Sequence, residues 1–264
     1  MKLHFISLAA LITFGTTAAY TDQTPTVAAS PQQNTQQTEQ VVHDYLLNHP
    51  EVIMQSVQDF QKKQMDQMQD ATKAMAAQNV NSLFHQPNDP VAGNPNGKVT
   101  LVEFLDYQCG HCIAMTPVVD TLIKSNPDLR VVFKQFPIRG PVSTVAAKAA
   151  LAANNQGKFM AFHLALIKIL SSSQQPLSEN DIYKAAETAG LNLGKLKKDM
   201  NNKETDKALA ANYQLAQNLK LMGTPAFFIG KTNLNNNATA TAITYIPGGA
   251  EQQQFQSIID KNKA

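Results

Sequence analysis

The sequence predicts an α/β fold with a helical insertion, preceded by a long N-terminal helical segment. An apolar strand over residues 98–105 runs directly into a Cys-x-x-C motif that opens a helix, and a second strand follows at 129–136. This spacing is typical of a strand–helix–strand unit with parallel strands and a right-handed crossover. Apolar periodicity then predicts a largely helical block up to about residue 221, before the chain returns to strands.

Residues 1–19 have the pattern of a secretory signal peptide. A basic start at Lys2 precedes a mostly apolar stretch, and the small residues Thr17, Ala18 and Ala19 suit cleavage after Ala19. The apolar stretch is too short to span a bilayer, and the alternative interpretation is an N-terminal core helix. A cleaved signal predicts export to an oxidising compartment.

Composition excludes two classes of partner. Hydrophobic residues make up 43% of the chain and charged residues 16%, which suits a globular core rather than a disordered chain. The net charge is +2, and removing Lys2 with the signal leaves 2 − 1 = +1. Because no basic block is present either, we expect neither nucleic acid nor an anionic membrane as a partner.

A flexible leader is predicted over residues 20–37, which are rich in Thr, Gln, Ala and Pro. A helical dimerisation segment follows over 38–84. Its second helix is predicted from Pro50, since proline suits a first helical turn, to about Asn79. The helix carries an apolar stripe at alternating three- and four-residue spacing, formed by Met54, Val57, Met65, Met68, Ala71 and Met75. The stripe must be covered, either by the chain's own domain or by a second chain, and we expect a dimerisation arm.

The catalytic domain is predicted over residues 85–264, where a Pro- and Gly-rich lead-in reaches a core that starts near Lys98. The helical insertion spans about 142–221. Within it, Ser178 begins one helix and Gly190 follows the end of that helix. The last elements are strands over 226–229 and 242–246 and a helix over 251–259.

The motif Cys109-Gly110-His111-Cys112 contains both cysteines of the chain, so any disulfide within the chain must join these two. A thiolate is the species that attacks disulfides, and a helix start lowers the pKa of a cysteine placed there. We therefore expect Cys109 to be the nucleophile and Cys112 the buried resolving thiol. His111 can donate a hydrogen bond to the Cys109 sulfur or place a positive charge near it. Gly110 leaves the backbone of the loop free to change conformation, whereas a proline would stiffen it. The alternative is half of a zinc site, but no further cysteine or suitably spaced histidine exists. No metal and no cofactor are expected.

Two other positions carry possible chemistry. Thr224-Pro225 stands at the start of a strand and is a candidate cis peptide bond, the alternative being an ordinary trans turn. Glu103 is the one charge in an apolar strand, and a buried carboxylate has a raised pKa. It could instead face outward at a sheet edge, and Lys134 in the neighbouring strand is its candidate partner.

Together, Cys-Gly-His-Cys after a strand, a helical insertion, and Thr-Pro before a β-hairpin resemble the DsbA-like thiol:disulfide oxidoreductases, which have a thioredoxin fold. The resemblance covers about residues 85–264. It implies that Cys109 and Cys112 form the redox pair and that His111 stabilises the thiolate. It also implies that Glu103 shuttles the proton of the resolving thiol. Substrate would bind at Thr224, Pro225 and Gly110.

The chain departs from the DsbA pattern in its Gly-His dipeptide, which resembles that of protein disulfide isomerase. The active-site disulfide of that isomerase is less oxidising, with a reduction potential of roughly −180 mV against −120 mV for DsbA. Threonine before the proline resembles the dimeric isomerase DsbC. Residues 45–53 resemble the oligomerisation segment of dimeric or trimeric relatives such as the suppressor-of-copper-sensitivity proteins. This implies an oligomer, and we expect a homodimer, the alternative being a trimer.

The function that these resemblances imply is a periplasmic enzyme that forms or isomerises disulfides in cysteine-containing exported proteins. A membrane redox partner, DsbB-like or DsbD-like, would restore its active state. An alternative from another class is a non-catalytic periplasmic chaperone that binds unfolded chains in a dimer cleft. A copper-handling protein is a more distant alternative.

Overall fold

The computed structural model describes residues 31–173 and 175–263. The predicted signal peptide lies outside the described residues, as does most of the predicted leader. The contacts divide the chain into two compact units, residues 1–59 and 60–264. The units are described separately. None of the described helices combines the length and apolar content needed to cross a membrane.

The first unit contains helix α1 (Pro31–Asn48) and the start of helix α2 (Pro50–Gln78). α1 begins inside the segment predicted as a flexible leader, because its glutamines are good helix formers. α2 begins at Pro50, where the sequence predicts it. Both helices expose large apolar side chains in this unit, which are Val41, Val42, Tyr45, Leu47, Val52, Ile53, Met54 and Val57.

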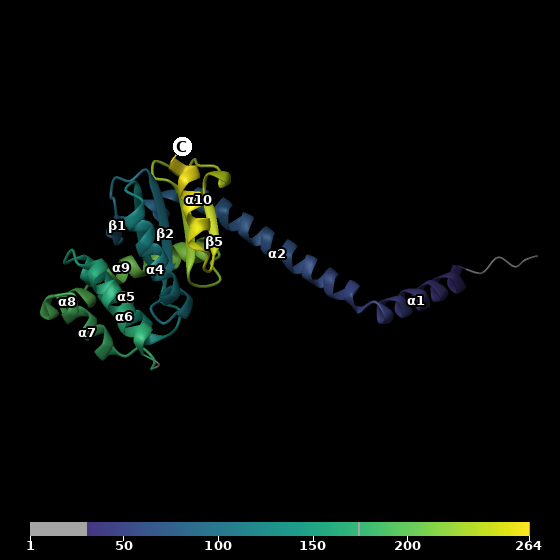
Figure 1. Ribbon diagram of the computed structural model, residues 1–264, viewed down its shortest axis with the longest axis horizontal. Coiled ribbons are helices and arrows are strands. Elements are labelled where there is room, and N and C mark those ends of the chain that lie inside the picture. Colours follow the sequence, from purple (N-terminus) through teal and green to yellow (C-terminus); the bar gives the residue numbers. More distant parts are fainter. Residues whose placement is uncertain (1–30, 174, 264) are drawn as a thin grey trace, which may run out of the picture. The chain divides into compact units, whose positions relative to one another are not determined.

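The second unit is built on one five-stranded sheet with the strand order β1-β3-β2-β4-β5. Figure 1 labels β1, β2 and β5 of this sheet. β2 and β3 are parallel, as the strand–helix–strand pattern predicts, and the other three pairings are antiparallel. The strands are β1 (Val91–Gly93), β2 (Val99–Leu105), β3 (Leu129–Gln135), β4 (Ala226–Lys231) and β5 (Thr244–Pro247). Where β1 lies, the sequence predicts only an extended lead-in.

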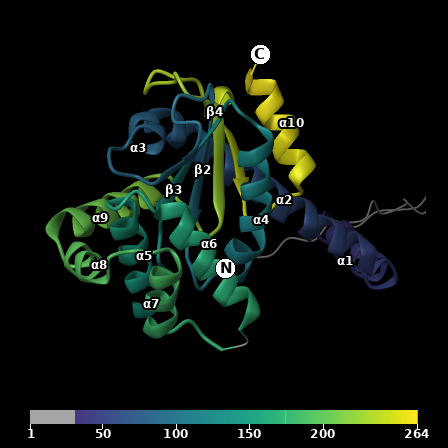
Figure 2. The same cartoon turned by 60° about the vertical axis from the view of Figure 1, so that its left-hand side comes forward.

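Helices cover both faces of this sheet. Alternate residues of a strand point to opposite faces, and β2 has apolar residues on both. Leu101 and Leu105 of β2 pack with α4 (Gly110–Ser125) and α10 (Gln252–Lys263) in one apolar cluster. Val102 and Phe104 belong to a second cluster with α3 (Val80–Phe84) and the end of α9 (Lys203–Asn218). Figure 2 shows α4 and α10 on one side of the strands and α3 on the other.

The predicted helical insertion is present between β3 and β4. It consists of α5 (Pro141–Asn154), α6 (Phe159–Ser172), α7 (Glu179–Thr188), α8 (Leu193–Met200) and α9. Ser178 caps α7 through a reciprocal bond with Asp181, and Gly190 takes the left-handed conformation just after the helix. Both signals were readable in the sequence.

The core begins earlier in the chain than Lys98, which corrects the sequence analysis. Val80, Leu83 and Phe84 of α3 have no exposed surface, and the last turns of α2 bury Thr72, Ala76 and Ala77. The stripe of α2 is therefore covered by the chain's own domain at its C-terminal end. Farther toward the N-terminus, Phe60, Met65 and Met68 stay exposed.

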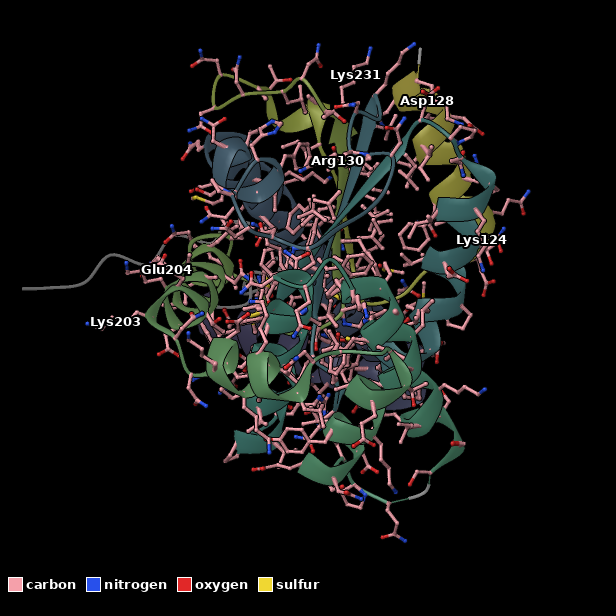
Figure 3. The ribbon with its side chains drawn as sticks, turned by 90° about the vertical axis from the view of Figure 1, so that its left-hand side faces the viewer. Lys124, Asp128, Arg130, Lys203, Glu204 and Lys231 are labelled. Carbon is pink, nitrogen blue, oxygen red and sulfur yellow. The ribbon has the colours of Figure 1, made fainter. Side chains whose placement is uncertain are left out.

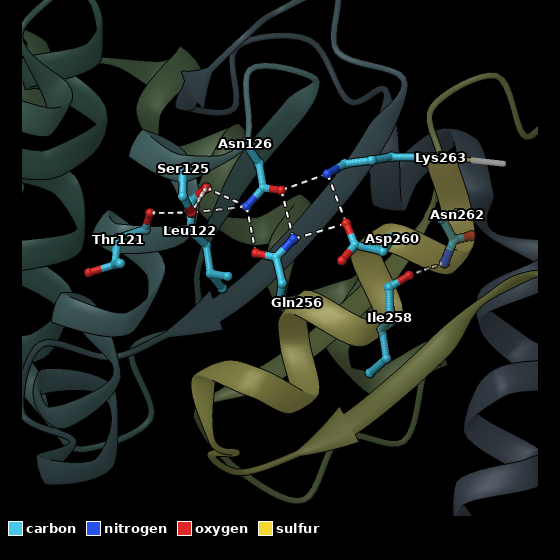
Figure 4. Close-up of polar contacts among 9 residues, drawn as sticks. All are labelled: Thr121, Leu122, Ser125, Asn126, Gln256, Ile258, Asp260, Asn262 and Lys263. Carbon is cyan, nitrogen blue, oxygen red and sulfur yellow. Dashed lines mark hydrogen bonds and ion pairs between the residues drawn. The ribbon is translucent and has the colours of Figure 1, made fainter.

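The far end of α4 is fixed to α10 by side-chain amides (Figure 4). Asn126 and Gln256 donate to each other over 2.9 Å in both directions, and Lys263 donates to the Asn126 oxygen over 2.8 Å. Asn126 is buried, so these bonds satisfy groups that water cannot reach.

Lys134 does not pair with Glu103, and this expectation is wrong. In the register of β2 and β3, Lys134 lies opposite Phe104 and so points to the other face. Its ammonium group instead forms a buried ion pair with Asp89 and donates to the Ser82 carbonyl over 2.6 Å. Arg130 donates to the Phe84 carbonyl over 2.7 Å. These bonds hold α3 and the following loop to the sheet. Figure 3 shows Arg130 with its neighbouring side chains.

We predict that Lys134→Met lowers the free energy of unfolding by about 3–5 kcal/mol at pH 8, because it leaves the Asp89 carboxylate buried without its partner. Burial raises the pKa of Asp89 to about 6, although the charge of Lys134 opposes the shift, so the carboxyl is ionised at pH 8. Urea unfolding measures the change.

The matched control is Lys124→Met, which removes an exposed lysine paired with Asp120 on α4. Exposed pairs contribute little, so the control should lose less than about 1 kcal/mol. Equal losses in the two variants would contradict the structural role given to Lys134.

Candidate active site

Cys109 lies where the loop after β2 meets the start of α4. Its backbone is extended (φ −87°, ψ 112°), and it occupies the residue position just before the helix. The thiol is buried and donates to the Thr224 carbonyl over 3.1 Å. Cys112 lies one turn farther along the helix and is also buried, and both cysteines are free thiols. The structure therefore places Cys109, Cys112 and Thr224 together.

The two thiols differ in acidity. Burial acts to raise the pKa of Cys109, but the nearby Thr224 side chain and contacts with Cys112 outweigh it. The backbone N–H groups of Cys112 and His111 also stabilise the thiolate, and the net pKa is lowered. Burial raises the pKa of Cys112, and the nearby charge of Glu103 raises it further. Cys109 is thus the thiol of the pair that ionises first.

The Thr224–Pro225 peptide bond is cis, so the predicted cis bond is confirmed. Pro225 stands directly before β4, and its carbonyl accepts a hydrogen bond from the Gly248 N–H over 2.9 Å. The Thr224 hydroxyl is buried beside the site and has no hydrogen-bond partner among the described residues. The loop reaches Cys109 because β4 pairs with β2, with Ala226 opposite Phe104.

Glu103 lies in the middle of β2 with only 1% of its surface exposed, so it is not an outward-facing edge residue. It shares its face of the strand with Leu101 and Leu105, which pack in the same cluster as Cys112. Burial raises the pKa of Glu103 to about 8, with a smaller contribution from the charge of Cys109. A carboxyl group with this pKa can exchange a proton near neutral pH.

Asp106 organises the loop before the motif, and the sequence analysis missed it. Its carboxylate accepts from the backbone N–H groups of Gln108, Ile138 and Arg139 at 2.8–2.9 Å and from the Ser143 hydroxyl at 2.6 Å. An aspartate that bonds to the backbone two residues on is a recognisable turn former. That local signal could have identified the turn, but not the bonds to residues more than thirty positions away.

Tyr107 and His163 form a second buried pair that the sequence analysis did not find. The Tyr107 hydroxyl lies 3.0 Å from His163 Nδ1, and the His163 ring stacks on Phe159 and packs against Phe133. Burial lowers the pKa of His163 to about 4, so the imidazole is neutral at physiological pH. The sequence offered no signal, because the pairing depends on how α6 packs beside the loop.

Gly110 and His111 are exposed in the first turn of α4. A side chain at Gly110 would meet no atom within 4 Å, so the surface there is open to a substrate. Among the residues that the structure describes, no three His, Cys, Asp or Glu side chains are grouped as metal ligands.

Comparison with known proteins identifies the family. Residues 100–260 match the DSBA-like thioredoxin domain, and residues 35–67 match the N-terminal domain of the copper resistance protein ScsC. The chain belongs to the DSBA-like thioredoxin domain family. It has the thioredoxin-like fold predicted from its sequence.

Two solved structures are similar over most of their length. BcfH of Salmonella enterica Typhimurium is 32% identical with a TM-score of 0.72, and the alignment covers 88% of this chain and 96% of that one. A thioredoxin-like oxidoreductase from Silicibacter pomeroyi DSS-3 is 37% identical with a TM-score of 0.59, covering 69% and 96%.

The curated relatives match over shorter stretches. The thiol:disulfide interchange protein DsbA of Bordetella pertussis is 38% identical over 68 residues, which are 26% of this chain and 30% of that protein. The Na(+)/H(+) antiporter NhaA 3 of Salinispora tropica is 29% identical over 143 residues, 53% of this chain. The chain spans only 21% of that antiporter's length.

We predict that Glu103 makes stability fall as pH rises. The folded protein keeps the Glu103 proton up to a pKa of about 8, whereas the unfolded chain releases it near 4.5. Between these values the native state binds more protons, so the free energy of unfolding decreases with pH, by up to about 1.4 kcal/mol per unit. Urea unfolding from pH 5 to 8 in a Cys109→Ser, Cys112→Ser background measures the slope without titration of the thiols.

Glu103→Gln should remove this part of the slope, whereas Glu187→Gln, at an exposed position of α7, should leave it unchanged. A slope in Glu103→Gln as steep as in the parent protein would show that the Glu103 carboxyl is not the titrating group, since the raised pKa of Asp89 accounts for only part of it.

Proposed function

We propose that this protein is a thiol:disulfide oxidoreductase that works in the periplasm on cysteine-containing exported proteins, in which it forms disulfides and reshuffles incorrect ones. The observation that carries the proposal is the position of the Cys109 sulfur. It lies at a helix start and against the Thr224 carbonyl, and its pKa is lowered while that of Cys112 is raised. This asymmetry suits one attacking and one resolving thiol.

In the oxidative direction, a substrate thiolate attacks Cys109 of the Cys109–Cys112 disulfide. A bond forms between the substrate and Cys109, and Cys112 leaves as the thiolate. A second substrate thiolate then attacks the first substrate sulfur, so the substrate gains a disulfide and Cys109 takes both electrons of the broken bond. In isomerisation, reduced Cys109 attacks a substrate disulfide, and another substrate thiolate later displaces it without net oxidation.

Glu103 fits the role of proton carrier for Cys112. The leaving Cys112 thiolate is buried and has a raised pKa, so it must be protonated, and in the reverse step it must lose that proton. The Glu103 carboxyl lies on the face of the sheet that packs with Cys112, and its pKa is about 8. His111 fits the role of thiolate stabiliser through its backbone N–H and its exposed ring in the first turn.

No cofactor enters this scheme, because the two sulfurs store the electron pair themselves. An oxidase must be reoxidised, which a DsbB-like membrane partner would do, and an isomerase must be kept reduced, which a DsbD-like partner would do. The Gly110-His111 dipeptide supports a moderately oxidising couple that serves both directions.

The experiment that tests this function is trapping of substrates. In Cys112→Ser the mixed disulfide at Cys109 cannot be resolved, so exported proteins should accumulate as disulfide-linked adducts in cells and be released by reductant. The double variant Cys109→Ser, Cys112→Ser is the matched control and should trap none. Equal recovery from both variants, with refolding still assisted, would favour the alternative of a non-catalytic chaperone.

We also propose that the N-terminal helices form a homodimer. Residues 35–67 match the ScsC N-terminal domain, and over this range α1 and α2 expose apolar side chains at helical spacing. Such a stripe is typical of a helix that packs against a partner. A dimer would place two Cys109 sites around one cleft, which suits repeated trials of disulfide pairings.

We predict that Ile53→Glu with Val57→Glu yields a monomer, because both side chains are exposed and lie one turn apart on the same face of α2. Mass measurement in solution decides the assembly state. The monomer should keep its oxidase activity and lose most of its activity on scrambled disulfides.

Gln55→Glu, on the opposite face of the same helix, is the matched control and should remain a dimer. Full isomerase activity in the monomeric variant would show that the shared cleft is not needed.

A further inference from the structure

A groove of about 500 Å³ lies within the second unit, between the C-terminal half of α2 and the segment that follows α9. It is lined by Gln64, Gln67, Met68, Ala71, Thr72, Lys220 and Met222. Its apolar lining comes from two methionines and an alanine, and Lys220 is the charged residue of the lining. Methionine side chains adapt to differently shaped apolar partners.

The lining of the groove ends two residues before the loop that contacts the reactive sulfur. Met222 precedes Thr224 by two residues, so their Cα atoms are at most about 7 Å apart. The Thr224 carbonyl in turn lies 3.1 Å from the Cys109 sulfur. A polypeptide whose cysteine is joined to Cys109 therefore has neighbouring residues within reach of Met222.

The backbone conformation just after α9 explains why Met222 is exposed. Lys220 has a left-handed conformation (φ 55°), which glycine usually adopts after a helix and which is costly for lysine. The Leu221 N–H bonds to the Ala216 carbonyl over 3.0 Å, and Leu221 packs on the apolar cluster beneath. Met222 is then turned outward, with 81% of its surface exposed. The strained backbone at Lys220 thus exposes a large apolar side chain beside a reactive thiol. This combination indicates that Met222 has a function there.

We propose that this groove binds the substrate polypeptide itself, through an apolar side chain roughly two to four residues from the cysteine that reacts with Cys109. The inference rests on the proposed function and adds a preference for sequence around the substrate cysteine. The second half of α2 thereby belongs to the substrate surface, in addition to any role of the first half in assembly. The long aliphatic stem of Lys220 can cover the bound apolar group while its ammonium stays in water.

The test uses two peptide–glutathione mixed disulfides and the full-length reduced enzyme. One peptide carries Phe three residues from its cysteine, and the other carries Ser there. Cys109 attacks the peptide sulfur, the bond to glutathione breaks, glutathione leaves as the thiolate, and Cys112 then displaces the peptide. The wild type should react with the Phe peptide about fivefold faster than with the Ser peptide, because part of the ring is buried.

Met222→Ser and Ala71→Glu should each bring this ratio close to one. Met65→Ser is the matched control, since Met65 is an exposed methionine of α2 outside the groove, and it should keep the ratio. A preference for Phe that survives in Met222→Ser and Ala71→Glu would overturn the inference. So would a change in solution mass caused by Met222→Ser, since the groove would then be an interface with a second copy.

A reaction with glutathione disulfide alone distinguishes failure of the groove proposal from failure of the proposed function. If the wild type reduces it and reacts equally with both peptides, the groove proposal fails and the thiol chemistry stands. If the wild type reduces neither glutathione disulfide nor the peptides, the proposed function fails, and this inference fails with it.

Discussion

The contact between the Cys109 sulfur and the Thr224 carbonyl is the interaction on which the site depends. It requires two chain segments more than a hundred residues apart to meet, and the sheet brings them together. β2 leads into α4 and so places Cys109 at a helix start, while β4 pairs antiparallel with β2 and so places Thr224 and Pro225 beside it. Asp106 holds the intervening turn through four hydrogen bonds, which fixes the sulfur relative to both segments.

One consequence is that two cysteines a single turn apart have different chemistry. Burial disfavours both thiolates, but the donors around Cys109 reverse the effect for that sulfur alone. For Cys112 the charge of the nearby Glu103 carboxylate adds to the effect of burial and raises the pKa further. The site therefore separates an acidic, attacking thiol from a basic, resolving one and keeps a proton carrier near the second. The same burial excludes water from the sulfurs and strengthens these electrostatic effects.

Most of the fold could be predicted from the sequence, because its strongest signals are local. The strand before Cys109, the helical insertion, the capping residue Ser178 and the Thr-Pro dipeptide are readable from neighbouring residues. Contacts between distant segments were not readable. The short elements α3 and β1 are held by tertiary packing and by bonds such as Lys134 with Asp89. β1 lies within a stretch whose Pro and Gly content indicates a linker, and α3 comes just before that stretch. The pairing of Tyr107 with His163 and the reach of Asp106 likewise depend on packing of the insertion.

The most direct test of the account is titration of the Cys109 thiolate. In Cys112→Ala the single remaining thiol can be followed by its ultraviolet absorbance as pH is raised. The hydrogen bonds to Cys109 predict a pKa clearly below the value of about 8.5 for a free cysteine. A pKa at or above that value would show that the N–H groups at the helix start do not stabilise the thiolate, and it would contradict the assignment of Cys109 as the attacking group.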